Sequence, residues 1–248
     1  MSTLDFIAYS GELLGTAILV LLGNGVVANM LLKGTKGNGE GLMPIAVAWA
    51  VAVFVGVFIT APLSGAHLNP AVTLGLATVG KFEWALVPGY VLAQFIGAFL
   101  GQLLVILAYR DHYAATEDTG LVLATFGTDP AIPNGVSNVL TEAIGTFVLV
   151  FAVLYITGPK FGDSPGSLGA LDALPVALVV LGIGLSLGGP TGYAINPARD
   201  LGPRIAHAVL PLPHKGGSNW GYAWVPVVGP TIGALVAAGL WHVVPVAL

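Results

Sequence analysis

The stretches GAHLNPAVTLG, residues 65–75, and GYAINPARDLG, residues 192–202, determine the fold of this chain. Each contains one Asn-Pro-Ala triplet, Asn69-Pro70-Ala71 in the first and Asn196-Pro197-Ala198 in the second. Asn is favoured at the cap before a helix and Pro in its first turn, so each triplet predicts a helix start. The apolar stretch after each triplet is about 10 residues long, which is too short to cross a bilayer. We therefore expect two half-helices that enter the membrane without crossing it.

The sequence around these stretches has the composition of a membrane protein. Of its 248 residues, 56% are hydrophobic and 8% are charged, and the mean hydropathy is +0.89. This is too little charge for the surface of a soluble globule. Apolar runs of the length of a membrane span recur at about 8–32, 42–63, 84–109, 138–157, 173–189 and 222–246. We predict six spans.

Composition also excludes several kinds of chemistry. The chain has no cysteine, which excludes disulfides, thiol catalysis and cysteine-bound metals. The net charge of -4 argues against nucleic acid as a partner. The sequence shows neither a nucleophile–base pair nor a cluster of metal ligands, so we expect no metal, no cofactor and no enzymatic activity.

The two halves of the chain form an internal repeat. GELLGTAILV, residues 11–20, matches TEAIGTFVLV, residues 141–150, and FIGAFLG, residues 95–101, matches TIGALVA, residues 231–237. With the triplets between them, three matches occur in the same order. Each half holds three spans, an odd number, so the copies enter the membrane from opposite sides. We predict a single domain over 1–248, with repeat one at about 1–110, a connector at 111–137 and repeat two at 138–248.

The half-helices and the inversion together predict an aqueous path. Irregular backbone at membrane depth is tolerated only where it lines water or is buried by protein. Each cap uses the Asn oxygen, which leaves the amide donors of Asn69 and Asn196 free to point outward. Inverted copies also bring two helix N-termini together near the midplane, each equivalent to about +0.5 charge. We expect a wet lumen that repels cations.

Arg199 lies three residues after Asn196 on the same half-helix, so both side chains can face one lumen. The matching residue of the first half is Val72. A cation at a helix N-terminus opposes the helix dipole, so we favour a pore-lining role over the alternative, a salt-bridge staple. Asp200 lies four residues before Arg204, and a local ion pair is our interpretation of that carboxylate.

Paired triplets in two three-span halves resemble the major intrinsic protein family, the aquaporins and glycerol facilitators. SGAHLNPAV, residues 64–72, and GYAINPARDLGPR, residues 192–204, carry a likeness that covers nearly the whole chain. Asp200, Arg204 and the non-aromatic Pro226-Val227 pair are similar to the glycerol-conducting branch. The resemblance implies an aquaporin-like, all-α membrane protein. Its six transmembrane helices and two re-entrant half-helices would form two inverted three-span repeats.

The resemblance also implies a narrow selectivity filter. Trp49 lies twenty positions before the first triplet's Asn, where glycerol facilitators typically have Trp. Gly184 lies twelve positions before the Asn of the second triplet, where water-selective members usually have His, and its missing side chain would leave room that a His would fill. Tyr193, often Phe in facilitators, and Arg199 complete the set. Trp49 and Tyr193 would meet the CH groups of a solute and Arg199 its hydroxyls from the other wall, whereas Trp49 taken alone would be interpreted as a packing or interface residue.

Further roles are implied by the same likeness. Glu12 and Glu142 would buttress the half-helix loops by accepting backbone N–H bonds, although an intramembrane carboxylate is by default a functional-site hypothesis. We interpret the ring of His67 as structural. The backbone carbonyls that line the pore in this family belong here to Gly65, Ala66, His67, Gly192, Tyr193 and Ala194.

In function, the resemblance implies a passive channel for glycerol, other small neutral solutes and water that excludes ions and protons. Dihydroxyacetone, lactic acid, urea and hydrogen peroxide are further solutes to consider. Two alternatives stay open. One is a water-selective aquaporin. The other is a proton-coupled secondary transporter, because inverted repeats and broken helices also build carriers and Glu12 or Glu142 could bind protons.

The family likeness further implies a homotetramer in the lipid bilayer of the plasma membrane, with both termini cytoplasmic. Gly97, Gly101 and Gly233 predict close helix contacts, either within a subunit or between subunits. The charges oppose this orientation under the positive-inside trend. Lys81 and Lys160 would lie inside, and the cations outside would be Lys33, Lys36, Arg110, Arg204 and Lys215.

Overall fold

The structure is a computed structural model, and it describes residues 2–161 and 164–244. Within these residues, six helices are long and apolar enough to cross a membrane, which confirms the predicted number of spans. They are α1 (Thr3–Leu31), α2 (Leu42–Ser64), α4 (Val87–Ala108), α7 (Gly135–Tyr155), α8 (Leu174–Thr191) and α10 (Val225–Val243).

Two shorter helices follow the triplets, as the capping argument predicts. Helix α3 (Pro70–Thr78) has 9 residues and helix α9 (Pro197–Val209) has 13. The Asn69 side-chain oxygen accepts a hydrogen bond of 2.9 Å from the amide of Ala71, and that of Asn196 accepts one of 3.0 Å from Ala198. Even α9 reaches only about 20 Å at 1.5 Å per residue, less than the hydrocarbon core.

The connector contains two short helices that we did not predict. These are α5 (Arg110–Ala115) and α6 (Thr119–Ala124). Asp118 begins α6 by accepting hydrogen bonds from the amides of Gly120 and Leu121. A six-residue helix shows too little periodicity to be recognised in the sequence, and its cap is the main signal. Helix α7 also starts earlier than predicted, at Gly135, because Asn134 caps it.

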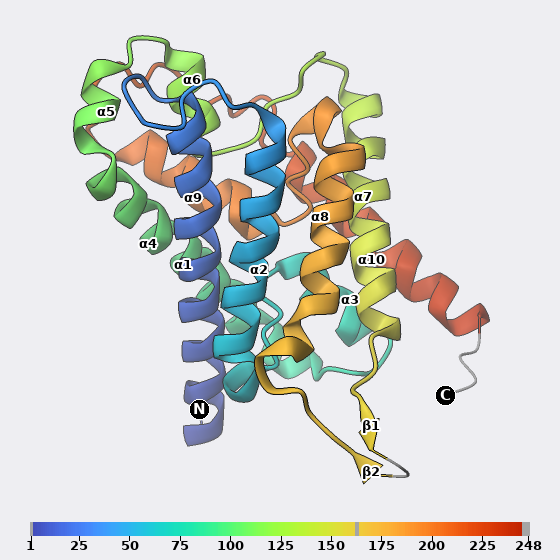
Figure 1. The fold of residues 1–248 in the computed structure, drawn as a ribbon. Coiled ribbons are helices and arrows are strands. Elements are labelled where there is room, and N and C mark those ends of the chain that lie inside the picture. The colour runs from blue at the N-terminus through green and yellow to red at the C-terminus, as the bar shows by residue number, and fades with distance from the viewer. Residues whose placement is uncertain (1, 162–163, 245–248) are drawn as a thin grey trace.

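The loop between α7 and α8 forms a small hairpin. Strands β1 (Lys160–Phe161) and β2 (Ser164–Pro165) pair antiparallel. A 3-10 segment, Gly169–Ala173, then leads into α8, and a second one, Trp84–Leu86, precedes α4. Figure 1 shows this hairpin at the same end of the molecule as the start of α1 and the end of α10, whereas α5 and α6 lie at the opposite end.

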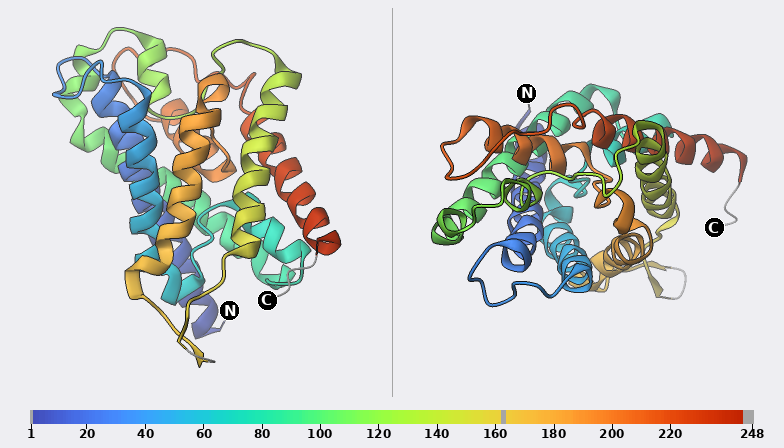
Figure 2. Two further views of the ribbon diagram at one scale, coloured as in Figure 1. Left: turned by 45° about the vertical axis from the view of Figure 1, so that its right-hand side comes forward. Right: turned by 90° about the horizontal axis from the view of Figure 1, so that it is seen from above.

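The helices pack as two equivalent sets. Helix α1 packs on α2 and α4, and α7 packs on α8 and α10 in the same way. Helices α2 and α8 join the sets, while each half-helix packs on the last helix of the other repeat, α3 on α10 and α9 on α4. Figure 2 shows the same bundle from two further directions. The fold is the predicted pair of inverted three-span repeats.

Glycines allow the close packing within each repeat. A Cβ atom added at Gly97 would overlap the backbone carbonyl of Leu13, and one at Gly101 that of Ala17. Gly233 lies in the same way against Ala143. Of the two alternatives for these glycines, the structure therefore shows the contact within one subunit, α4 on α1 and α10 on α7.

Candidate functional site

The backbone before each half-helix has an unusual and repeated conformation. In the first repeat φ is positive at Gly65 (78°), Ala66 (51°) and Leu68 (51°). In the second it is positive at the matching Gly192 (75°), Tyr193 (38°) and Ile195 (43°). Positive φ is costly for residues other than glycine and persists only where the surroundings hold it. Both loops must therefore be held by contacts outside themselves.

Buried carboxylates supply these contacts, one in each repeat. Glu12 accepts hydrogen bonds from the amides of His67 (2.9 Å) and Leu68 (2.7 Å). Glu142 accepts them from the amides of Ala194 (2.9 Å) and Ile195 (2.7 Å). Both glutamates are fully buried. These are the N–H bonds that the family resemblance implies for a buttress.

In the first repeat, Glu12 has additional partners that we did not predict. Gln94 donates from its side chain to Glu12 (2.7 Å) and to Thr73 (3.0 Å), and the Ser64 hydroxyl donates to Glu12 (2.7 Å). The signal available in the sequence was a Gln inside an apolar span. The His67 ring meets Thr73 at 3.1 Å from Nδ1 and lies edge-on to Phe82, contacts that fit a structural ring.

The two half-helices meet through their capping asparagines. The Asn69 amide nitrogen donates to the carbonyl of Ile195 (2.7 Å), and that of Asn196 donates to the carbonyl of Leu68 (2.8 Å). We expected the amide donors of both asparagines to point outward, and this is wrong for one of the two N–H donors of each side chain. Each amide group has two donors, so one remains for the lumen. The cross-bonding occurs because the opposite loop leaves a carbonyl unpaired at this depth.

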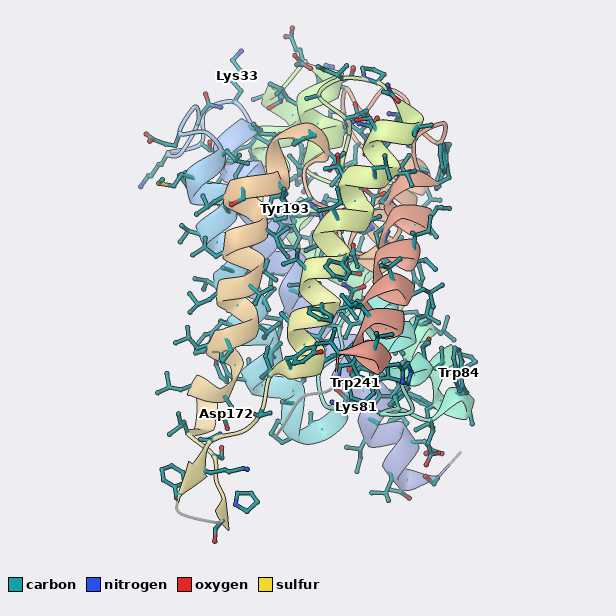
Figure 3. The ribbon with its side chains drawn as sticks, turned by 90° about the vertical axis from the view of Figure 1, so that its right-hand side faces the viewer. Lys33, Lys81, Trp84, Asp172, Tyr193 and Trp241 are labelled. Carbon is teal, nitrogen blue, oxygen red and sulfur yellow. The ribbon has the colours of Figure 1, made fainter. Side chains whose placement is uncertain are left out.

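A cavity of about 230 Å³ runs past this meeting point. Apolar side chains of α1, α2, α3, α7 and α8 form one part of its wall, and the two loops form the other. Gly65, Ala66, His67, Tyr193 and Ala194 line it, whereas Gly192 does not, because it lies against Thr128 instead. Figure 3 shows Tyr193 nearer the end that carries Lys33, and Asp172, which also lines the cavity, at the other end.

Arg199 and Trp49 lie together at the Tyr193 end of the cavity. The guanidinium carbon of Arg199 is 4.4 Å from the centroid of the Trp49 ring, so the cation stacks on the ring. Our expectation that they occupy opposite walls is wrong, since a buried cation gains from an aromatic face when no carboxylate pairs with it. Among the described residues, the Arg199 Nη1 atom and the Tyr193 hydroxyl are buried without a hydrogen-bond partner.

Gly184 stands behind the filter instead of in the cavity wall. A Cβ atom there would lie 3.0 Å from Cζ of Tyr193 and 3.2 Å from Cβ of Ala46. One turn later, a Cβ at Gly188 would lie 2.6 Å from Cδ1 of the same ring. We expected the missing side chain of Gly184 to leave room for a solute. The structure fills that room with the Tyr193 ring.

Two of the cations that oppose the expected cytoplasmic orientation of the termini have structural roles. Arg204 makes the predicted local pair with Asp200, at 2.8 Å and with both side chains fully buried. Lys215 donates to the carbonyls of Ala208 and Leu210, at the C-terminal end of α9. Lys81, one of the two cations expected to lie inside, donates likewise to the carbonyl of Leu154 near the end of α7. Cations at helix C-termini are favoured locally, so these charges reflect structure as well as topology.

The two buttresses give a prediction about stability. Glu12→Ala removes the acceptor of two amides and two side chains, while Glu142→Ala removes the acceptor of two amides. With about 1 to 3 kcal/mol for each buried donor left unpaired, we expect both variants to lose at least about 2 kcal/mol. Glu12→Ala should lose more. Thermal unfolding in detergent checks this, and equal midpoints for both variants and the wild type would contradict it.

Comparison with known proteins identifies the family that has this arrangement. The model of the family described as major intrinsic protein matches residues 2–241. The chain belongs to the major intrinsic protein family. The fold class inferred from the sequence, six spans with two half-helices in inverted repeats, is confirmed.

Three members of the major intrinsic protein family illustrate the relationship. The chain is 54% identical over 227 residues to the glycerol uptake facilitator protein of Streptococcus pneumoniae (strain ATCC BAA-255 / R6), covering 92% of this chain and 94% of the relative. It is 50% identical to the probable glycerol uptake facilitator protein of Thermotoga maritima, over 94% and 97%. The X-ray structure of the aquaglyceroporin from Plasmodium falciparum matches with a TM-score of 0.81 at 31% identity, over 96% and 95%.

Proposed function

We propose that this major intrinsic protein is a passive channel for glycerol, other small neutral solutes and water. One observation carries the proposal. The cavity between the half-helices is apolar on one part of its wall and is lined at one end by Arg199 and Tyr193, whose buried Nη1 atom and hydroxyl lack hydrogen-bond partners within the described part of the chain. Relatives at 48% to 54% identity are named glycerol uptake facilitators, which supports the same conclusion.

The chemistry of the wall suits a small polyol. A solute that leaves water loses hydrogen bonds, and an apolar pore would leave its hydroxyls unpaired at a cost of several kcal/mol. Arg199 offers charged donors, Tyr193 a hydroxyl, and the asparagines one amide donor each. The face of Trp49 and the valines and leucines of the wall accept the CH groups. Glycerol has both kinds of surface, and dihydroxyacetone, lactic acid, urea and hydrogen peroxide offer part of the same pattern.

Exclusion of ions and protons is part of the proposal. Two helix N-termini converge where the asparagines meet, and each contributes about half a positive charge. Arg199 adds a full charge at the filter, beside a wall that is largely apolar. The cross-bonded asparagines also fix the donors that face the lumen. Water channels exclude ions with an arginine and half-helix dipoles by the same physics, so this mechanism is not particular to this chain.

A water-selective pore is the second candidate within the channel class. It is disfavoured by the relatives at 48% to 54% identity, which are named glycerol uptake facilitators. A proton-coupled carrier is disfavoured by the state of the buried carboxylates. Glu12 accepts four hydrogen bonds and Glu142 two, in sites that hold a fixed backbone instead of a solute.

The proposal also covers the membrane in which the channel lies, the side of its termini and its oligomeric state. Six membrane-capable helices make it a multi-pass membrane protein. We infer the plasma membrane, cytoplasmic termini and a homotetramer, which the family resemblance implies. In Figure 1 the start of α1 and the end of α10 both lie at the end opposite to α5 and α6, which supports termini on one side of the membrane.

Uptake of labelled glycerol into vesicles tests the transport class. A channel predicts an initial rate that rises linearly with glycerol concentration and does not respond to an imposed proton gradient. A carrier, in contrast, would show saturation at low concentration or a rate that follows the gradient. Either of those results would overturn the channel.

A further inference from the structure

A segment of the connector, residues 125–131, lies against the second repeat close to the filter. Thr128 is its most connected residue and is almost fully buried. Its amide and its hydroxyl both donate to Oδ2 of Asp200, at 2.6 and 2.8 Å. Its carbonyl accepts from the Arg204 guanidinium at 2.7 Å. Every polar group of Thr128 is therefore used by the Asp200–Arg204 pair.

The same residue also reaches the loop that precedes α9. A Cβ atom added at Gly192 would lie 3.3 Å from the Thr128 methyl carbon, which places that methyl group directly over Gly192. A few residues further on, the amide of Ala131 donates to the carbonyl of Pro190 at 2.9 Å. The connector thus contacts the chain both before and after the filter residues of the second repeat.

The residues that Thr128 contacts are adjacent in sequence to the two filter residues of the second repeat. Gly192 directly precedes Tyr193, and Asp200 directly follows Arg199. Thr128 therefore holds the outer neighbours of both filter residues at once. The Tyr193 backbone has a φ of 38°, a conformation that needs external support. Arg199 has no ion-pair partner among the described residues. Its position therefore depends on α9, which carries it, and on the residues that hold α9 in place.

The Asp200–Arg204 pair extends the support to a third segment. Arg204 donates to the carbonyl of Ser218 at 2.9 Å, and the Asn219 side chain donates to Asp129 at 2.6 Å. The loop between α9 and α10 is thereby joined to the connector. A buried pair satisfied by this many hydrogen bonds rigidifies its surroundings, because each partner loses its full pairing if one group moves.

We propose that Thr128 is a positioning residue of the filter, which sets the spacing of Tyr193 and Arg199 by holding Asp200 with its hydroxyl and Gly192 with its methyl group. This inference rests on the proposed function. It assigns to the connector a part in solute selection, although the connector contributes no side chain to the described wall of the cavity.

Thr128→Val tests the role of the hydroxyl group, since valine keeps the side-chain shape and the backbone amide but loses the hydroxyl's hydrogen bond to Asp200. The readout is the permeability of a four-carbon polyol divided by that of glycerol, measured by light scattering on one vesicle preparation. This ratio does not depend on how much channel is inserted. Loss of a hydrogen bond to a charged group should loosen the filter and raise the ratio by about threefold or more.

Two matched variants separate positioning from general stability. Thr128→Ser keeps the hydroxyl and should keep a ratio near that of the wild type. Thr125→Val removes a hydroxyl from an equally buried threonine of the same segment, whose partners are Tyr113 and Val122. Because the Thr125 hydroxyl bonds neither Asp200 nor Arg204, this variant should also leave the ratio unchanged.

The outcomes are distinct. A Thr128→Val ratio equal to that of the wild type overturns the inference, and so does an equal shift in Thr125→Val. Thr128→Ala is measured in parallel in case the Thr128→Val variant does not insert into vesicles. Failure of both variants to insert would also overturn the inference, because Thr128 would then be needed for the whole fold and not for the filter alone. Wild-type vesicles that pass glycerol no faster than protein-free ones would instead overturn the proposed function.

Discussion

Gly184→Leu should reduce glycerol flux to the level of protein-free vesicles. The position has no space for a side chain, because even a Cβ atom would lie 3.0 Å from the Tyr193 ring and 3.2 Å from Ala46. Tyr193 cannot retreat along α8, since Gly188 already touches its other edge. The ring would move toward Trp49 and Arg199, into the lumen. Light scattering in a glycerol gradient measures the loss.

Gly182→Leu is the matched control for this variant. Gly182 lies two residues earlier on α8, is exposed and has nothing within 4 Å of an added Cβ atom. The same substitution there adds the same apolar bulk on the outer face of the helix. We expect wild-type flux. Normal conduction by Gly184→Leu, at an equal amount of inserted protein, would show that Tyr193 does not border the path of the solute.

Arg199→Val should raise proton leakage, because it removes a full positive charge from the filter. Valine is the residue that the first repeat carries at the matching place, Val72, so the backbone tolerates it. At an effective dielectric constant of about 20 and a distance of about 6 Å, one unit charge repels a cation by about 3 kcal/mol. Its loss corresponds to about a hundredfold in permeation. The half-helix dipoles remain, so exclusion should weaken without vanishing.

A pH-sensitive dye inside vesicles, with an imposed membrane potential, measures this leak. Arg110→Val serves as the control, because it removes the same charge from an exposed position at the start of α5. That variant should leave the leak at the level of the wild type. Leakage in Arg199→Val no greater than in Arg110→Val would contradict the assigned role of Arg199.

Local rules were sufficient to predict the half-helices. An Asn cap followed by Pro specifies a helix start from neighbouring residues alone, and the structure shows both caps at Asn69 and Asn196. The inverted arrangement followed from counting spans, which depends only on length and hydropathy. The Asp200–Arg204 pair was predictable because its members are four residues apart on one helix.

The remaining features depend on contacts between distant segments. The cross-bonds of Asn69 to Ile195 and of Asn196 to Leu68 join residues more than a hundred positions apart. No spacing rule indicates which loop provides the acceptor. The stacking of Arg199 on Trp49 has the same origin, since it depends on how α9 and α2 approach each other. The role of Gly184 was misjudged because a glycine shows where a side chain is absent without showing what fills the space.

Conduction of glycerol is tested most directly by the rate at which proteoliposomes reswell in an inward glycerol gradient, compared with protein-free vesicles and with Gly184→Leu vesicles at an equal protein-to-lipid ratio. We expect the wild-type vesicles to reswell faster than both. Reswelling no faster than in protein-free vesicles, together with rapid water flux, would contradict a glycerol channel and establish a water-selective pore.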